Sequence, residues 1–147
     1  MKSPSLLAIF STLFVVIQAG CARDTGPMAT FHCEVDGITY VAVFSGDRIE
    51  KSPEWRDDQP NPPVSVRDAM SAAKKELPSM VGKPSNWQVK SVMLVQLHER
   101  TWVYKVFFYE KPWIPVSMPK SIFIVVPMDG TAIHPEIIKP KGESPPK

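Results

Sequence analysis

Prolines restrict how this chain can fold more than any other feature does. Sixteen prolines and only seven glycines occur among the 147 residues. Four prolines lie in residues 51–63, three in 110–119 and four in 134–147. Proline lacks a backbone N–H and interrupts both helices and sheet ladders. These stretches are therefore predicted to be connectors or a tail, with short regular elements between them.

Composition and charge narrow the class of protein. Hydrophobic residues make up 44% of the chain and charged residues 22%, which is typical of a globular protein. The length suits one domain. The formal net charge is only +2. A chain this close to neutrality has no strong field to attract nucleic acid, so we expect no nucleic-acid partner.

Residues 1–20 are typical of a secretory signal peptide. Lys2 gives a basic start, and residues 6–19 form the apolar run LLAIFSTLFVVIQA. This run suits the core of a signal peptide and is short for a membrane-spanning helix, which needs about 20 apolar residues. The protein is therefore expected to be exported.

The end of the apolar run resembles the bacterial lipoprotein signal. Ala19-Gly20-Cys21 match the two small residues and the cysteine of that family, whereas Gln18 stands where an aliphatic residue is usual. The resemblance implies cleavage before Cys21 and a lipid anchor on its thiol. The protein would then be membrane-anchored on the periplasmic or outer face of the cell envelope, with residues 21–30 as a polar tether.

Two other fates of Cys21 remain open. Cleavage after Ala19 would leave Cys21 able to pair with Cys33, the only other cysteine, in an oxidising compartment. Cleavage after Ala22 would remove Cys21. Either event would give a secreted soluble protein. Cys33 lies on the apolar side of an alternating pattern, which predicts a small buried residue.

Residues 31–50 predict a β-hairpin. Two apolar-alternating runs flank Asp36-Gly37, and this dipeptide between such runs is a strong hairpin signal. Arg48-Ile49-Glu50 is expected to begin a brief third strand. Residues 51–63, KSPEWRDDQPNPP, are predicted to be a proline-rich linker. Trp55 within this linker is expected to pack on the core, because an indole ring can bury a large area.

An amphipathic helix follows the linker. Ser65 is the predicted N-cap, with Asp68 three residues later as in a capping box. Pro78 is expected to end the helix near Leu77. The apolar stripe recurs at helical spacing and comprises Val66, Ala69, Met70, Ala73 and Leu77.

Three alternating segments after the helix predict antiparallel strands at residues 87–97, 101–109 and 121–128. The middle segment is apolar on both faces and is therefore expected to be the central strand. Asp129-Gly130 predicts a second hairpin turn, followed by a short strand at 131–133. One face of the first segment is expected to hold Trp87, Val89, Ser91, Met93, Val95 and Leu97.

This order of elements predicts the α+β class. The expected architecture is an antiparallel β-meander with one amphipathic helix packed on the sheet, preceded by an N-terminal β-hairpin. We expect a single domain at residues 31–135, with the helix and meander in 64–135. Residues 136–147 are expected to form a flexible tail rich in proline and lysine.

Residues 62–135 are similar to small bacterial PepSY-like domains. The likeness lies in the capped helix PPVSVRDAMSAAKKEL, the aromatic strand WVYKVFFYE and the segment IFIVVPMDGTAI. It implies a helix paired with a β-meander. It also implies a role in inhibiting or chaperoning proteases, or in regulating the cell envelope. No catalytic residues accompany the likeness.

Catalytic and metal-binding motifs are missing from the sequence. The three histidines, His32, His98 and His134, lie in different predicted elements without ligand spacing. Asp57 and Asp58 are adjacent in the linker, where carboxylates are usually solvated. We therefore predict no catalytic residue, no metal and no cofactor, and a protein that is not an enzyme.

The predicted partner surface is the loop at residues 111–119. Three prolines stiffen it, and a rigid apolar loop can bind a partner at low entropic cost. Alternatively, the loop covers an open end of the sheet. Its apolar side chains are Trp113, Ile114, Val116 and Met118.

These observations lead to one functional hypothesis and two alternatives. The first is an envelope lipoprotein, held to the membrane through Cys21, that binds a protein or peptide without catalysis. The second is a secreted enzyme, or enzyme subunit, with an unrecognised pocket near His98 or Glu99. The third is a purely structural envelope protein.

Overall fold

The computed structural model describes residues 27–56, 58–111 and 120–138, with side chains from residue 29 onward. The signal segment, Cys21 and the loop at 112–119 therefore lie outside the described residues, as do the four apolar side chains of that loop. The elements are β1 (Pro27–Val35), β2 (Ile38–Ser45), α1 (Gly46–Lys51), α2 (Val66–Glu76), η1 (Leu77–Ser79), η2 (Pro84–Asn86), β3 (Trp87–His98), β4 (Thr101–Glu110), β5 (Ser121–Pro127) and β6 (Glu136–Ile138).

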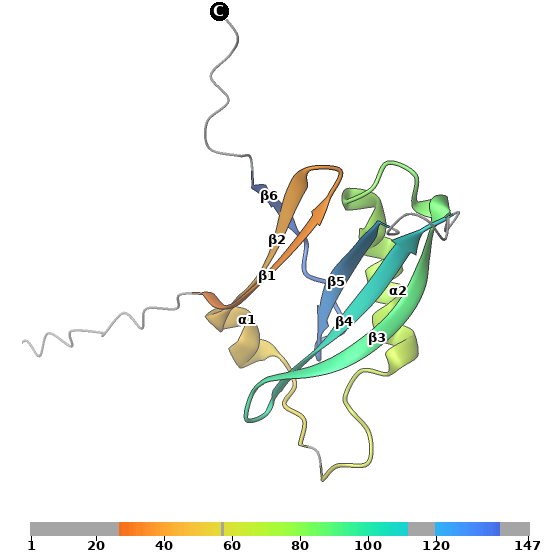
Figure 1. Ribbon diagram of the computed structural model, residues 1–147. Coiled ribbons are helices and arrows are strands. Elements are labelled where there is room, and N and C mark those ends of the chain that lie inside the picture. The colour runs from red at the N-terminus through yellow and green to blue at the C-terminus, as the bar shows by residue number, and fades with distance from the viewer. Residues whose placement is uncertain (1–26, 57, 112–119, 139–147) are drawn as a thin grey trace, which may run out of the picture.

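Two antiparallel three-stranded sheets form the frame of the molecule. Their strand orders are β1-β2-β6 and β3-β4-β5. Helix α2 covers one face of the second sheet, and the β1-β2 hairpin leans against β5 on the other side (Figure 1). The predicted α+β class is confirmed, as are the hairpin, the meander and the helix on the sheet.

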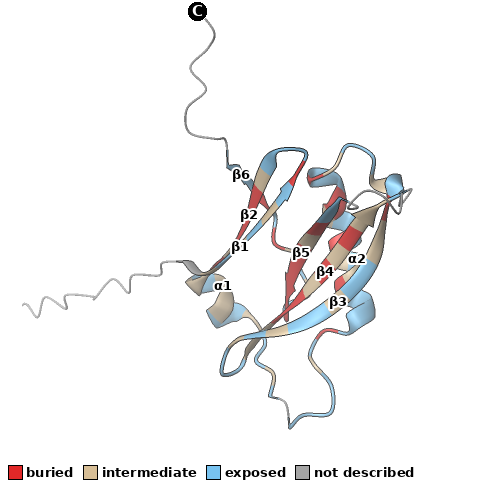
Figure 2. Cartoon of the chain, in the orientation of Figure 1, coloured by how far each residue is buried: buried red, intermediate tan, exposed pale blue. Residues whose placement is uncertain are grey.

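Strand β4 separates two apolar cores, as expected of a central strand. Tyr104, Val106 and Phe108 point to the α2 side, where they pack with Ala69 and Ala73 of the helix. Val103 points to the other side and joins a smaller core with residues of β2, β5 and the segment after β5. Figure 2 shows the buried residues concentrated in β4 and β5, whereas the middle of β3 is largely exposed.

Helix α2 begins and ends where the sequence predicts. The Ser65 hydroxyl accepts a hydrogen bond from the Asp68 backbone N–H at 3.1 Å, which satisfies one of the free N–H groups at the helix start. The helix passes into the short 3₁₀ turn η1 at Leu77, immediately before Pro78. The Tyr104 hydroxyl donates to the Val64 carbonyl at 2.9 Å and ties the helix start to the central strand.

The expected strand at Arg48–Glu50 is wrong, because these residues belong to α1. Ser45 stands at its N-cap position with extended backbone, and Asp47 in the first turn and Lys51 in the last suit the helix dipole. Ile49 packs against the smaller core, which supplies tertiary support to a helix of one and a half turns.

The expected strand at Thr131–Ile133 is also wrong, and so is the start of the tail at residue 136. Ile133 makes a single backbone hydrogen bond to Val125, at 2.9 Å. The chain then crosses to the first sheet, where β6 pairs with β2. The first sheet also starts earlier than predicted, since β1 begins at Pro27 within the expected tether.

The prediction that one face of β3 holds six alternating residues is wrong because of a β-bulge. The pairing with β4 shifts between Val89 and Ser91, so Lys90 has no opposite residue. Trp87 and Val89 therefore lie on the α2 side, while Met93 and Val95 lie on the other. An inserted residue reverses the alternation of every side chain that follows it.

Candidate functional site

Two hollows lie at opposite ends of the β1 strand. We call the first the hairpin-tip groove, a hollow of about 370 Å³ between the β1-β2 turn, the segment from η1 to η2, and the ends of β3 and β4. It is lined by Val35, Asp36, Ile38, Tyr40, Met80, Val81, Gly82, Lys83, Asn86, Trp87 and Glu110. The second, the Arg100 cleft, lies beside α1 at the end where β1 begins.

The hairpin turn sets one wall of the groove. Asp36 and Gly37 both adopt positive φ, at 53° and 74°, as a two-residue turn with the favoured twist requires. The turn places Ile38 on the groove wall with 40% of its surface exposed. The groove thus offers an apolar side chain to solvent at the tip of the hairpin.

Hydrogen bonds hold the opposite wall in place. The Tyr40 hydroxyl donates to the Met80 carbonyl at 2.8 Å, which ties the hairpin to the end of η1. The Lys111 N–H donates to the Asn86 carbonyl at 2.7 Å, which ties η2 to the end of β4. Burial, with the nearby Cys33 and Asp36, raises the pKa of Tyr40 and so favours the protonated hydroxyl that donates this bond.

The floor of the groove is apolar and its rim is charged. Trp87 is 9% exposed and packs in the main core together with Val35 and Met80. On the rim, the Lys120 ammonium contacts the Asp36 carboxylate and lies 3.7 Å from Glu110 Oε2. The hydrogen bond to Asp36 raises the pKa of Lys120. An apolar floor with a polar rim is the usual arrangement at a binding surface.

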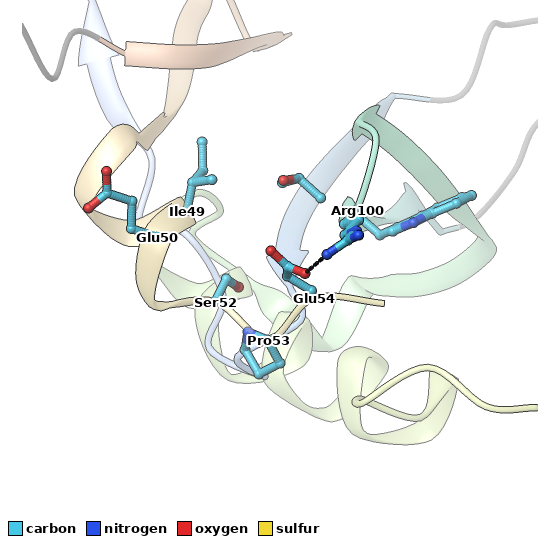
Figure 3. Close-up of a pocket in the computed structure, with 8 residues that line it drawn as sticks. Ile49, Glu50, Ser52, Pro53, Glu54 and Arg100 are labelled. Carbon is cyan, nitrogen blue, oxygen red and sulfur yellow. Dashed lines mark hydrogen bonds and ion pairs between the residues drawn. The ribbon is translucent and has the colours of Figure 1, made fainter. Parts of the chain in front are cut away.

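The Arg100 cleft is smaller, at about 200 Å³, and its main charges are paired (Figure 3). The Arg100 guanidinium lies 3.1 Å from Glu54 across it. Trp55 packs edge-on against Trp102 with ring centroids 5.0 Å apart. Its contact with the main core is therefore through Trp102, which packs against that core. Three buried polar atoms near this contact have no hydrogen-bond partner among the described residues: Ser52 Oγ, Trp55 Nε1 and Trp102 Nε1.

The three histidines, for which the sequence predicts no catalytic or metal-binding role, lie in separate places. His32, His98 and His134 are exposed, in β1, at the end of β3 and before β6. Neither His98 nor Glu99 lines the groove or the cleft. Within the described ranges, no three His, Cys, Asp or Glu side chains are grouped as a metal site. The open hollow of about 430 Å³ beside α2 has a polar lining of Asp68, Lys75 and Glu76 with small residues.

Cys33 is half-buried between the sheets and has no disulfide partner among the described residues, which do not include Cys21. Its Sγ lies 4.0 Å from the Phe123 carbonyl oxygen. Burial raises the pKa of the Cys33 thiol, and the Phe123 contact and the Lys105 charge oppose this effect only in part. The thiol is therefore protonated at neutral pH, which makes it a weak nucleophile.

The groove residues were missed in the sequence because they come from four separate segments. The nearest sequence prediction is the loop at 111–119, most of which lies outside the described residues; the residue before it, Glu110, lines the groove, and Lys111 bonds to Asn86. Among the described residues, no helix is long and apolar enough to cross a membrane. Comparison of the chain with family models, curated proteins and solved structures found no match.

Proposed function

We infer that this protein is an exported, non-catalytic module that binds a segment of another protein in the hairpin-tip groove. One observation carries the proposal: a groove of about 370 Å³, whose walls are tied by hydrogen bonds, combines an apolar floor with a charged rim. Ile38 and Trp87 offer contacts to an apolar side chain. Asp36 and Lys83 offer polar contacts to the adjoining peptide.

The loop at 111–119 belongs to the same proposed surface. We include Trp113, Ile114, Val116 and Met118 in this proposal, because the residues that flank the loop, Glu110 and Lys120, lie at the groove rim. The PepSY-like pattern of the sequence supports the same role, since such domains are associated with inhibiting or chaperoning proteases and with regulating the cell envelope.

Photocrosslinking at the groove tests the binding role. We expect a photoreactive amino acid at Ile38 to form one discrete adduct with an envelope protein. The same residue at Val66, which is 49% exposed on α2, should form none. Ile38→Glu should also lower partner recovery at least tenfold, with Val66→Glu as the matched control. Equal recovery with both variants would contradict the assignment to the groove.

We also propose that Cys21 carries the lipid anchor. The apolar run, Ala19-Gly20 and the polar residues after Cys21 support this proposal. Intact-mass measurement of the mature protein should show an N-terminal Cys21 with added diacylglycerol and acyl mass. An unmodified N-terminus at Gly20 or Arg23 would instead indicate a secreted soluble protein.

A further inference from the structure

Strand β3 has a free edge along its whole length. In the second sheet β3 pairs with β4 alone among the described residues, so its outer backbone groups have no strand partner. The strand has 12 residues, which corresponds to about 40 Å. The other outer edge with exposed apolar side chains, β6, has only three residues. A long free edge is a template for another strand.

The middle of β3 lacks the features that usually protect an edge. Natural edge strands carry charges, prolines or bulges against unwanted pairing. Here the bulges lie on either side, where Lys90 and Leu97 have no opposite residue in β4. Between them, Ser91–Gln96 reads SVMLVQ, without charge, proline or glycine. Met93 and Leu94 are 52% and 37% exposed and point to opposite faces.

The geometry points to a second copy of this chain as the occupant of the edge. We assign a two-fold axis through Met93, with the two β3 strands antiparallel and each sheet face continuous across the axis. This register places Met93 against Met93, Val92 against Leu94 and Ser91 against Val95. The only charged residue of the strand, Lys90, falls opposite Gln96. The strand is therefore self-complementary, since no like charges meet and apolar residues cover one another.

The resulting dimer has a six-stranded sheet with both α2 helices on the same face. The exposed Met93 and Leu94 would each be covered by the equivalent strand of the partner. The interface is small, so we expect association in the micromolar range. A closed two-fold contact uses up the free edge and prevents further addition of strands.

Measuring the oligomeric state tests this assignment. The chain from residue 21 with Cys21→Ser should sediment as a dimer at roughly 100 µM and dissociate on dilution to below about 1 µM. Met93→Lys should weaken association at least tenfold. Ile137→Lys, at a position 56% exposed on β6, should leave it unchanged. A wild-type chain that stays monomeric up to about 1 mM would overturn the proposal, as would dissociation by Ile137→Lys.

Disulfide crosslinking tests the register independently of any effect of charge on folding. Opposite residues in an antiparallel pair have Cβ atoms about 4.5–5.5 Å apart, close to the range a disulfide needs. In a background with Cys21→Ser and Cys33→Ala, Met93→Cys should form a covalent dimer at least ten times faster than Ile137→Cys. Equal rates of covalent dimer formation for the two variants would overturn the two-fold register. Failure of the photocrosslinking at the groove would contradict the proposed function but would not affect this register.

Discussion

Among the described residues that line or adjoin the groove, Gly37 has the most restrictive backbone conformation. Its φ of 74° lies in the left-handed region, where a side chain is disfavoured by about 1–2 kcal/mol. Asp36 tolerates the neighbouring position because its short polar side chain is accepted there more readily than most. The turn that shapes the groove wall therefore depends on two adjacent residues.

Replacing Gly37 should destabilise the protein through its backbone alone. A Cβ at Gly37 would meet nothing within 4 Å, so no steric clash adds to the cost. We expect Gly37→Ala to lower the free energy of unfolding by about 1 kcal/mol. Gly82→Ala is the control, since Gly82 has equal space and no positive φ. Urea denaturation distinguishes the two, and equal losses would contradict a conformational origin.

Tyr104 should make stability depend on alkaline pH. Its side chain is 2% exposed, and burial raises its pKa above the ordinary value of 10.0. Below pH 10 the folded and unfolded states both hold the proton, so its full contribution to stability is present. As pH rises through the folded-state pKa the contribution is lost, because the folded state holds the proton longer than the unfolded state does.

The variant Tyr104→Phe tests this linkage. The substitution should lower the free energy of unfolding by about 1 kcal/mol at neutral pH, because the Val64 carbonyl loses its hydrogen-bond donor. The difference in free energy of unfolding between variant and wild type should become smaller above pH 10, because phenylalanine has no hydroxyl to ionise. Urea unfolding across that range measures the difference. If this difference stays constant with pH, Tyr104 does not contribute to the loss of stability at alkaline pH.

At the scale of elements, local signals in the sequence predicted structure well where they coincide with packing. Ser65 and Asp68 predicted the start of α2, and the paired apolar faces of residues 101–109 predicted the central strand. Asp36-Gly37 predicted the hairpin turn. At the helix start and at the hairpin turn, core residues lie directly beside the residues that set the local backbone: Val64 precedes Ser65, and Val35 precedes Asp36.

The elements that sequence reasoning missed depend on partners distant in the chain. β6 exists because β2 offers it a pairing edge, and nothing within Glu136–Ile138 indicates that edge. The bulge at Lys90 reverses the faces of β3 without a glycine or proline to mark it. The groove likewise combines segments from residue 35 to residue 110, so no local motif could identify it.

Removal of β6 should therefore lower stability more than removal of the residues after it. A chain that ends at Pro135 loses the pairing of three residues with β2, which we expect to cost roughly 1–2 kcal/mol. A chain that ends at Ile138 keeps this pairing and serves as the control. Thermal or urea unfolding of the two chains measures the effect. Equal stabilities would show that β6 adds nothing to the first sheet.

At the scale of the whole molecule, the start of β1 and the groove lie at opposite ends of that strand. Only residues 22–26 separate Cys21 from Pro27, so a lipidated Cys21 would lie within about 20 Å of the start of β1. From there β1 runs about 27 Å to Val35 at the groove. The Arg100 cleft is lined in part by Ile49 and Glu50 of α1. Helix α1 lies close to the start of β1 (Figure 1).

This arrangement predicts that the groove faces away from the bilayer. In lipidated protein with Cys33→Ala, fluorophores attached at Glu54→Cys and at Ile38→Cys should differ in energy transfer to an acceptor in the lipid headgroups. Transfer should be stronger from Glu54, which lies at the cleft, because transfer falls steeply with distance. Both positions are exposed at the surface, so labelling itself should disturb the fold little. Equal transfer, or stronger transfer from Ile38, would mean that the domain lies on the membrane with its groove covered, and would contradict partner binding at a free groove.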